Sequence, residues 1–172
     1  MVATIGYERA SLIDFIATLQ LSKIDVLVDV RDRAQSRRPG FSKSALSNAL
    51  REAGIGYVHF RELGDPKEGR EAARRGDFDR FRAIYAGVMA TDAAKEAIAK
   101  LEDLASEAQI CLMCYERDQS TCHRKIVADR LETKLGAKAR HLGVREGAGI
   151  ETANGRVRHS HQSTAASIQH AL

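Results

Sequence analysis

The chain has 172 residues, 44% of them hydrophobic and 29% charged, which fits one domain with its own core and excludes a disordered chain. Its longest apolar runs, Val26–Val30 and Ile110–Met113, fall far short of the roughly 18 residues that a membrane span requires. A formal net charge of +4 favours anionic partners such as phosphates, nucleotides or nucleic acid.

Cysteine usage and the N-terminal sequence bear on the cellular compartment. Three cysteines, an odd number, argue against a secreted disulfide framework in a chain of this size. Met1–Ile5 is too short an apolar stretch for the centre of a signal peptide. We therefore expect a cytoplasmic protein with reduced thiols that does not associate with membranes.

The first part of the chain alternates between strand and helix patterns. Val2–Ile5 predicts a strand, and Ser11 with Asp14 three positions later has the spacing of a capping box at a helix start. The aliphatic run Ile24–Val30 is typical of a strand that is covered on both faces in a parallel sheet. A second helix is predicted over Ser42–Ala53.

The middle of the chain continues this alternation after an interruption. Ile55–Phe60 predicts a third strand, whereas the charge-dense segment Arg61–Gly76 is interpreted as a surface excursion or lid. Asp77 and Thr91 are each predicted to cap a helix. Gln109–Cys114 is the most apolar strand candidate.

A last helix and strand complete the pattern, over Cys122–Leu135 and Ala137–Gly143. Strands and helices in alternation predict a single three-layer α/β domain. Its mostly parallel central sheet would have about five strands flanked by helices, a Rossmann-like arrangement. We assign residues 1–143 to this domain. Residues 144–172 form a C-terminal extension, for which we expect a hairpin at Asn154-Gly155 and a short helix.

Parallel sheets of this kind bind ligands beyond the carboxyl ends of their strands, where helix N-termini expose amide hydrogens. This rule selects the loops Gly6–Ala10, Arg31–Lys43 and Cys114–Arg124. The cations of the second loop are Arg31, Arg33, Arg37, Arg38 and Lys43. Because guanidinium groups match phosphate oxygens, we expect an anion site there. The alternative is a solvated basic loop paired with nearby carboxylates, with Arg31 partly structural.

The third loop gathers a thiol, a carboxylate, an imidazole and a guanidinium at a strand-to-helix turn. His123 and Arg124 fall in the first turn of a helix, where the dipole disfavours a cation unless an anion lies in front of it. Glu116 and His123 are therefore candidates for a general acid or base, and Cys114 for a nucleophile. Alternatively, Cys114 packs in the core and Glu116 pairs with Arg31 or Arg124.

The cysteines also raise the question of a metal. Cys111 and Cys114 form a C-x-x-C string, but residues three apart in a strand point to opposite faces. Cys114, Cys122 and His123 can converge across the loop, although no fourth ligand is evident. We predict no metal and no other cofactor.

Two further positions are weighed beside the loops. Tyr7, with Glu8, follows the first strand and is a candidate for the same site, and His59 lies at a strand end. For His59 a packed or hydrogen-bonded role competes with ligand binding. His159 and His161, in the extension, are interpreted as solvated.

A family resemblance covers roughly Val2 to Gly143. The strings that carry it are Thr4-Ile-Gly-Tyr-Glu8, Leu27-Val-Asp-Val-Arg31, Ser36-Arg-Arg-Pro-Gly-Phe-Ser-Lys43, Gly54-Ile-Gly-Tyr-Val-His59, Leu63-Gly64 and Cys114-Tyr-Glu-Arg-Asp-Gln-Ser-Thr-Cys-His-Arg124. Together they resemble the domain-of-unknown-function family 488, whose members are α/β proteins with the same Asp-Val-Arg strand end and Cys-His-Arg helix start. The chain departs from the family at Asp32-Arg33-Ala34-Gln35, where members carry an aromatic-proline pair. The resemblance implies the fold and the site, and no reaction.

These patterns support three functional hypotheses. The first is an enzyme that acts on a phosphate-bearing substrate, a nucleotide or nucleic acid, by hydrolysis or glycosidic-bond cleavage, with Glu116, His123 and Cys114 as catalytic residues. Its phosphate-binding residues would be Tyr7, Arg31, Arg37, Arg38, Lys43, His59 and Arg124. The second is a non-catalytic module that binds nucleic acid or nucleotides, which the low aromatic content of 5% disfavours. The third is a thiol-dependent enzyme that uses Cys114 or Cys122. The sequence leaves the oligomeric state open.

Overall fold

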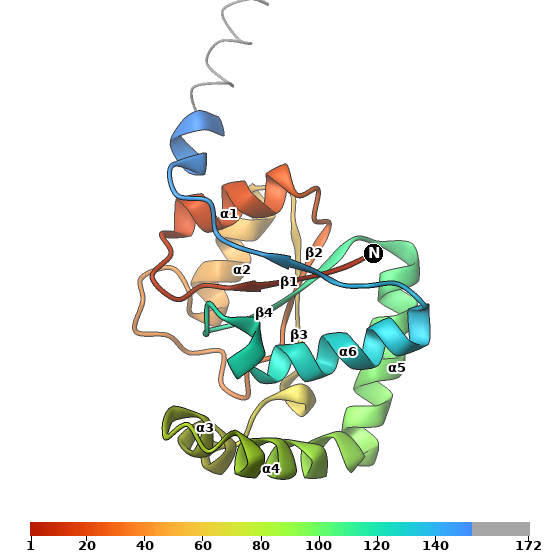
Figure 1. Ribbon diagram of the computed structural model, residues 1–172. Helices are drawn as coiled ribbons and strands as arrows, with labels where there is room; N and C mark the ends of the chain where they lie inside the picture. The colour runs from red at the N-terminus through yellow and green to blue at the C-terminus, as the bar shows by residue number, and fades with distance from the viewer. Residues whose placement is uncertain (153–172) are drawn as a thin grey trace, which may run out of the picture.

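Five parallel strands form the central sheet of the computed structural model, which describes residues 1–152 (Figure 1). The strands are β1 (Val2–Gly6), β2 (Val26–Asp29), β3 (Gly56–His59), β4 (Ile110–Cys114) and β5 (Arg140–Leu142). Their order across the sheet is β3-β2-β4-β1-β5, and each neighbouring pair is parallel. The predicted three-layer α/β domain is confirmed.

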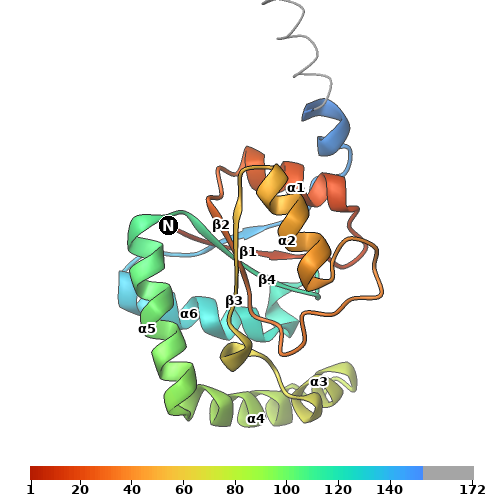
Figure 2. The same ribbon diagram turned by 180° about the vertical axis from the view of Figure 1, so that it is seen from behind.

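Helices cover both faces of the sheet (Figures 1 and 2). Helices α1 (Leu12–Leu21) and α2 (Lys43–Glu52) pack on one face, and α5 (Asp92–Glu107) and α6 (His123–Leu135) on the other. The remaining helices are η1 (Arg61–Leu63), α3 (Lys67–Arg74), α4 (Phe78–Ala90) and η2 (Gln119–Thr121). Among residues 1–152, each helix is too short or too polar to cross a membrane.

Strand β4 shows how the two cores are separated. Ile110, Leu112 and Cys114 belong to the core under α5 and α6. Cys111 and Met113 belong to the core under α1 and α2. The two cysteines of the C-x-x-C string therefore lie on opposite faces of the sheet, as strand alternation predicts.

The predicted helix starts are observed with their capping contacts. The Ser11 hydroxyl accepts a hydrogen bond from the Asp14 amide and donates one to the Asp14 carboxylate. Asp77 and Thr91 accept from the amides of Arg80 and Ala94. These bonds satisfy amides that the first helical turn leaves without partners, and so they fix where each helix begins.

The segment 61–76 differs from its prediction as a surface excursion. It contains η1 and α3, and it buries Leu63, Gly69 and Ala72. Its small residues are spaced three apart, which gives α3 a narrow apolar face that packs beside α4. The sequence interpretation missed this helix because the high charge density masked the short stripe.

The extension begins by packing against α1. The Arg145 amide donates to the Thr18 hydroxyl over 3.0 Å, and the Gly149 amide donates to the Asp14 carboxylate over 3.0 Å. Residues 148–152 are helical, in line with the expected short helix. The predicted hairpin at Asn154-Gly155, His159 and His161 lie outside the described residues.

The end of β1 is built around a close backbone approach at Gly6. A methyl group there would lie 1.8 Å from the carbonyl oxygen of Glu116 and 3.0 Å from Cα of Arg117. Gly6→Ala should therefore lower the free energy of unfolding by about 3 kcal/mol, since backbone must move to make room. Urea denaturation measures this loss.

Gly87 provides the matched control, because it lies within α4 with open space around its Cα. Gly87→Ala should raise stability by roughly 0.5–1 kcal/mol, since alanine is the better helix former. Equal stability of the two variants would contradict the close approach at Gly6.

Candidate functional site

A cavity of about 940 Å³ opens at the carboxyl edge of the sheet, and residues after β1, β2 and β4 line it together with α3, α4 and the start of α6. Its arginines are Arg31, Arg33, Arg37, Arg38, Arg70 and Arg74. Its carboxylates are Asp32, Asp65 and Glu116, and Cys114, Cys122 and His123 also face it. Loops that are distant in sequence therefore meet where the parallel topology places their strand ends.

Arg31 is held within a buried network and is only 6% exposed. Its Nε and Nη2 donate to the two carboxylate oxygens of Asp29 over 2.8 and 2.6 Å. Its Nη1 donates to the Tyr7 hydroxyl and to the carbonyl of Phe41. Burial opposes the charge of Arg31, but the Asp29 carboxylate outweighs it and raises the pKa of the guanidinium. Arg31 therefore ties the loop after β1 to the two ends of the loop between β2 and α2, and most of its donors are used within the protein.

Arg124 and His59 are also committed to the backbone of neighbouring loops. Arg124, 1% exposed, donates to the carbonyls of Glu116 and Arg117, so it shapes the loop after β4. His59 Nε2 lies 2.7 Å from the Arg31 carbonyl. Neither residue lines the cavity, and Lys43 is exposed at the start of α2, also outside its lining.

The other residues predicted from sequence do line the cavity. They are Tyr7, Arg31, Arg37, Arg38, Cys114, Glu116 and His123. Arg38 donates through Nη2 to the Ala10 carbonyl over 2.6 Å, while its buried Nε has no partner among residues 1–152. Arg37 is exposed and makes no hydrogen bond or ion pair within the same range.

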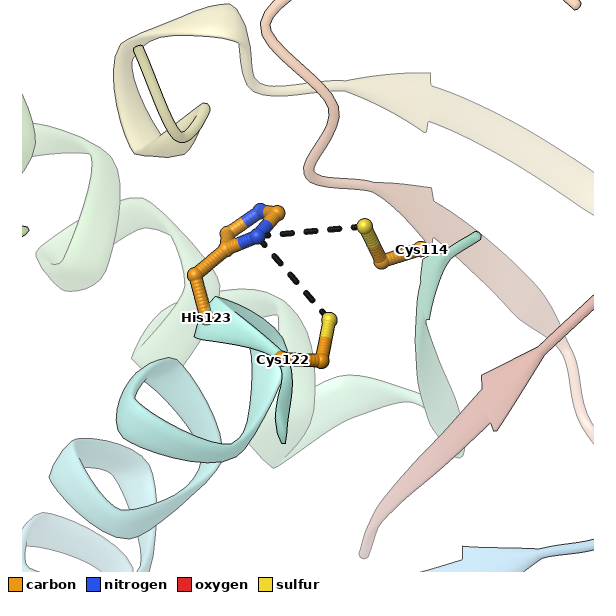
Figure 3. Close-up of side chains that lie close together, drawn as sticks. All are labelled: Cys114, Cys122 and His123. Atoms are coloured by element: carbon orange, nitrogen blue, oxygen red, sulfur yellow. Dashed lines mark hydrogen bonds between the residues drawn. The ribbon is translucent and has the colours of Figure 1, made fainter. Parts of the chain in front are cut away.

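Cys114, Cys122 and His123 form a compact cluster at the base of the cavity (Figure 3). Cys114 ends β4, Cys122 is the N-cap of α6 and His123 opens that helix. The His123 Nδ1 atom lies 3.8 Å from Sγ of Cys114 and 3.9 Å from Sγ of Cys122. Its Nε2 lies 2.7 Å from the Val30 carbonyl, which only accepts, so Nε2 carries a proton and Nδ1 faces the sulfurs.

The two thiols of this cluster are buried, and burial raises the pKa of Cys122 well above its ordinary value. At Cys114 the hydrogen bond from Cys122 opposes the shift. Burial and the neighbouring Glu116 carboxylate outweigh this bond, so they raise the pKa of the Cys114 thiol. Because the thiolate is the reactive form, both thiols are poor nucleophiles in this state. This counts against the hypothesis of a thiol-dependent enzyme.

Glu116 is half-buried beside the cluster, and its pKa is lowered rather than raised. Its Oε2 accepts a hydrogen bond from Sγ of Cys114 over 3.3 Å. Burial alone would raise its pKa, but the Cys122 thiol, His123 and the Cys114 thiol outweigh burial and lower the pKa of Glu116. The carboxylate is therefore ionised at neutral pH.

Asp65 is a cavity residue that the sequence interpretation missed. It lies between η1 and α3, it is 4% exposed, and its Oδ1 has no hydrogen-bond partner among residues 1–152. A methyl group on Gly69 would lie 2.0 Å from this oxygen, so the glycine makes room for the carboxylate. Burial raises the pKa of Asp65 to about 6. The one sequence feature that pointed to Asp65 was the Asp65-Pro66 pair, which is typical of a helix start.

The N-terminus of α6 adds a partial positive charge to the same cavity. Thr121, Cys122 and His123 line the cavity at this helix end. The side chain of the N-cap residue makes no capping hydrogen bond, and the first turn has no acidic residue. The uncompensated end of the helix dipole therefore favours an anion in the cavity.

The Asp29–Arg31 ion pair leads to a stability prediction. Asp29→Asn should lower the free energy of unfolding by about 3 kcal/mol, because it leaves a buried guanidinium without its counter-charge. Tyr57→Phe removes a single 2.6 Å hydrogen bond to Asp29 and should cost about 1 kcal/mol. Chemical denaturation provides both values.

Asp103→Asn is the control for this pair of variants, since Asp103 is exposed on α5 and its replacement should stay within about 0.5 kcal/mol of the parent. An Asp29→Asn protein as stable as the Asp103→Asn protein would refute the structural role of the ion pair.

Comparisons with known proteins place the chain in one family. A family model described as "Domain of unknown function DUF488" matches residues 11–131, a span that runs from the N-cap of α1 into α6. Searches of curated proteins and of solved structures find no match. The matched span includes the basic loop, Asp65 and the Cys–His cluster, and the chain therefore belongs to the DUF488 family.

Proposed function

We propose that the protein is an enzyme that acts on a phosphate-bearing substrate, a nucleotide or a nucleic acid, by hydrolase-type chemistry in this cavity. One observation carries the proposal: exposed arginines and two carboxylates of opposite pKa shift line the same cavity. The three cysteines are free thiols, which supports a cytoplasmic location for the enzyme.

Phosphate binding is assigned to the arginines that are not already engaged. Arg33, Arg37 and Arg74 are exposed and line the cavity, and their side chains make no hydrogen bond or ion pair within residues 1–152. By contrast, Arg70 pairs with Asp32 over 3.4 Å, and Arg31 with Asp29. A phosphate between the basic loop and α3 would meet guanidinium donors from both sides and would lie within the field of the α6 N-terminus.

Acid and base roles follow from the separated pKa values of the two carboxylates. Glu116, ionised, would take a proton from the attacking water, and Asp65, with a pKa of about 6, would give a proton to the leaving oxygen or nitrogen. The reaction thus removes one proton from water and returns one to the leaving group, which suits hydrolysis of either a phosphoester or a glycosidic bond.

Phosphate binding predicts a loss of affinity in Arg37→Gln. Removing one charge-assisted contact should weaken the binding of nucleoside monophosphates about tenfold. Isothermal titration calorimetry with adenosine and guanosine monophosphates gives the affinities, and binding by the parent should weaken as salt is raised.

Arg75→Gln is the matched control, because Arg75 is exposed at the end of α3 and does not line the cavity. Its affinity should equal that of the parent protein. An equal loss in both variants would mean that net charge, and not the cavity, attracts the anion.

Catalysis predicts that Glu116→Gln lowers turnover about 100-fold or more while leaving ligand affinity nearly unchanged. Turnover is measured on a panel of nucleotides and short oligonucleotides as release of inorganic phosphate, nucleoside or free base. Asp65→Asn should show a loss of similar size, because the amide cannot donate the required proton at that position.

Glu62→Gln serves as the control variant and should retain full turnover, because Glu62 is exposed on η1 outside the cavity lining. Nucleotide binding without any turnover by the parent protein would favour the non-catalytic binding module, which the same arginines would support.

A further inference from the structure

We propose that Cys114, Cys122 and His123 are the protein ligands of a zinc ion whose fourth coordination position faces the cavity. Their donor atoms, two Sγ and one Nδ1, all lie within 4.8 Å of one another. Figure 3 shows the imidazole ring and both thiols directed to a common point between the end of β4 and the start of α6. The sequence alone predicted no metal, since no fourth protein ligand was evident.

The separations of the donor atoms match those of a tetrahedral zinc site. Zinc lies about 2.3 Å from sulfur and about 2.05 Å from nitrogen, which at tetrahedral angles places sulfur and nitrogen about 3.6 Å apart. The observed distances from Nδ1 to the two sulfurs are 3.8 and 3.9 Å. Both nitrogen–sulfur distances therefore lie within a few tenths of an ångström of the tetrahedral value, and the two sulfurs lie within 4.8 Å of each other.

The surroundings of His123 already orient it as a ligand. Its Nε2–H donates to the Val30 carbonyl over 2.7 Å, the kind of contact that fixes the tautomer of metal-bound histidines. The Tyr85 ring packs against the imidazole with 5.3 Å between centroids, and the Tyr85 hydroxyl is tied to the Leu63 carbonyl. The Nδ1 side of the ring is thus directed at the two sulfurs.

Cys122 occupies a position where a cysteine has no capping role. It is the N-cap of α6, a position that favours serine, threonine, aspartate or asparagine, and it makes no side-chain capping bond. Its thiol instead points at His123. The loss of a helix cap is consistent with a thiol retained for another purpose.

The donor set selects the metal and the type of site. Two thiolates and an imidazole favour zinc over magnesium or calcium, which prefer oxygen ligands. Binding releases the two thiol protons to solvent, and the two thiolates then balance the ion's charge. Three protein ligands leave one position for water or substrate, as in catalytic zinc sites. Glu116, within 3.3 Å of Cys114 Sγ, would lie beside that position as the base.

The experiment uses the full chain, stripped of metal with a chelator and kept reduced by a phosphine. Zinc is titrated in competition with a chromophoric chelator, and we expect about one equivalent to bind. Cys114→Ser, Cys122→Ser and His123→Gln should each weaken zinc binding by at least about 100-fold. Circular dichroism establishes whether each variant is folded.

Cys111→Ala is the matched control, because this cysteine is buried in the other core, on the opposite face of β4. It should bind zinc as the parent does. Loss of binding in this variant equal to that in Cys114→Ser would overturn the proposal.

Cobalt provides a second measurement that needs no variant. Cobalt bound to two thiolates should give intense sulfur-to-metal charge-transfer absorption, which added zinc should abolish. No metal bound by the parent, or cobalt absorption without thiolate bands, would each overturn the proposal. The zinc site deepens the proposed function, and only the role of the ion in catalysis rests on that function. Because metal content is measured without turnover, the zinc site and the proposed enzyme activity can fail separately.

Discussion

The buried ion pair between Asp29 and Arg31 is the interaction on which the geometry of the cavity depends. A guanidinium is stable in a protein interior only when a counter-charge and hydrogen-bond acceptors replace the water it has lost. Asp29 at the end of β2 supplies the counter-charge of Arg31. The Tyr7 hydroxyl after β1 and the Phe41 carbonyl before α2 are its further acceptors. The Tyr7 and Phe41 rings also stack, with centroids 4.5 Å apart. The same contacts that satisfy the charge therefore fix the loop after β1 against the loop between β2 and α2.

Burial divides the basic residues of the site into two groups. Arg31 and Arg124 are buried and have acceptors within the protein, so their charges hold loops in place. Arg33, Arg37 and Arg74 are exposed and keep their donors available. A cation that is essential to the shape of a pocket is thus distinct from one that binds its ligand. The number of arginines in a loop does not by itself show which of them hold the loop in place and which are available to a ligand.

Sequence patterns predicted the sheet and the loops of the site, because strand alternation, helix capping and the carboxyl-edge rule are local properties or follow from topology. Cys114, Glu116 and His123 were identified in this way. Asp65 was missed, since its significance comes from its burial next to α3, and the charge-dense segment gave little sign that this helix packs inward. The acceptors of Arg31 beyond Asp29 likewise depend on tertiary contacts.

Two glycines set the separation of the chemical groups across the cavity. Gly6 brings the end of β1 against the Glu116 backbone, and a methyl group on Gly64 would lie 2.3 Å from Cα of Asp32. The first contact places the acid and thiol groups of the loop after β4, and the second holds η1, and with it Asp65, against the basic loop. Because both are contacts with backbone, neither can relax by rotating a side chain. The segments that carry the Glu116 and Asp65 carboxylates are therefore held in one arrangement by backbone contacts, which is the preorganisation that the proposed enzyme would need.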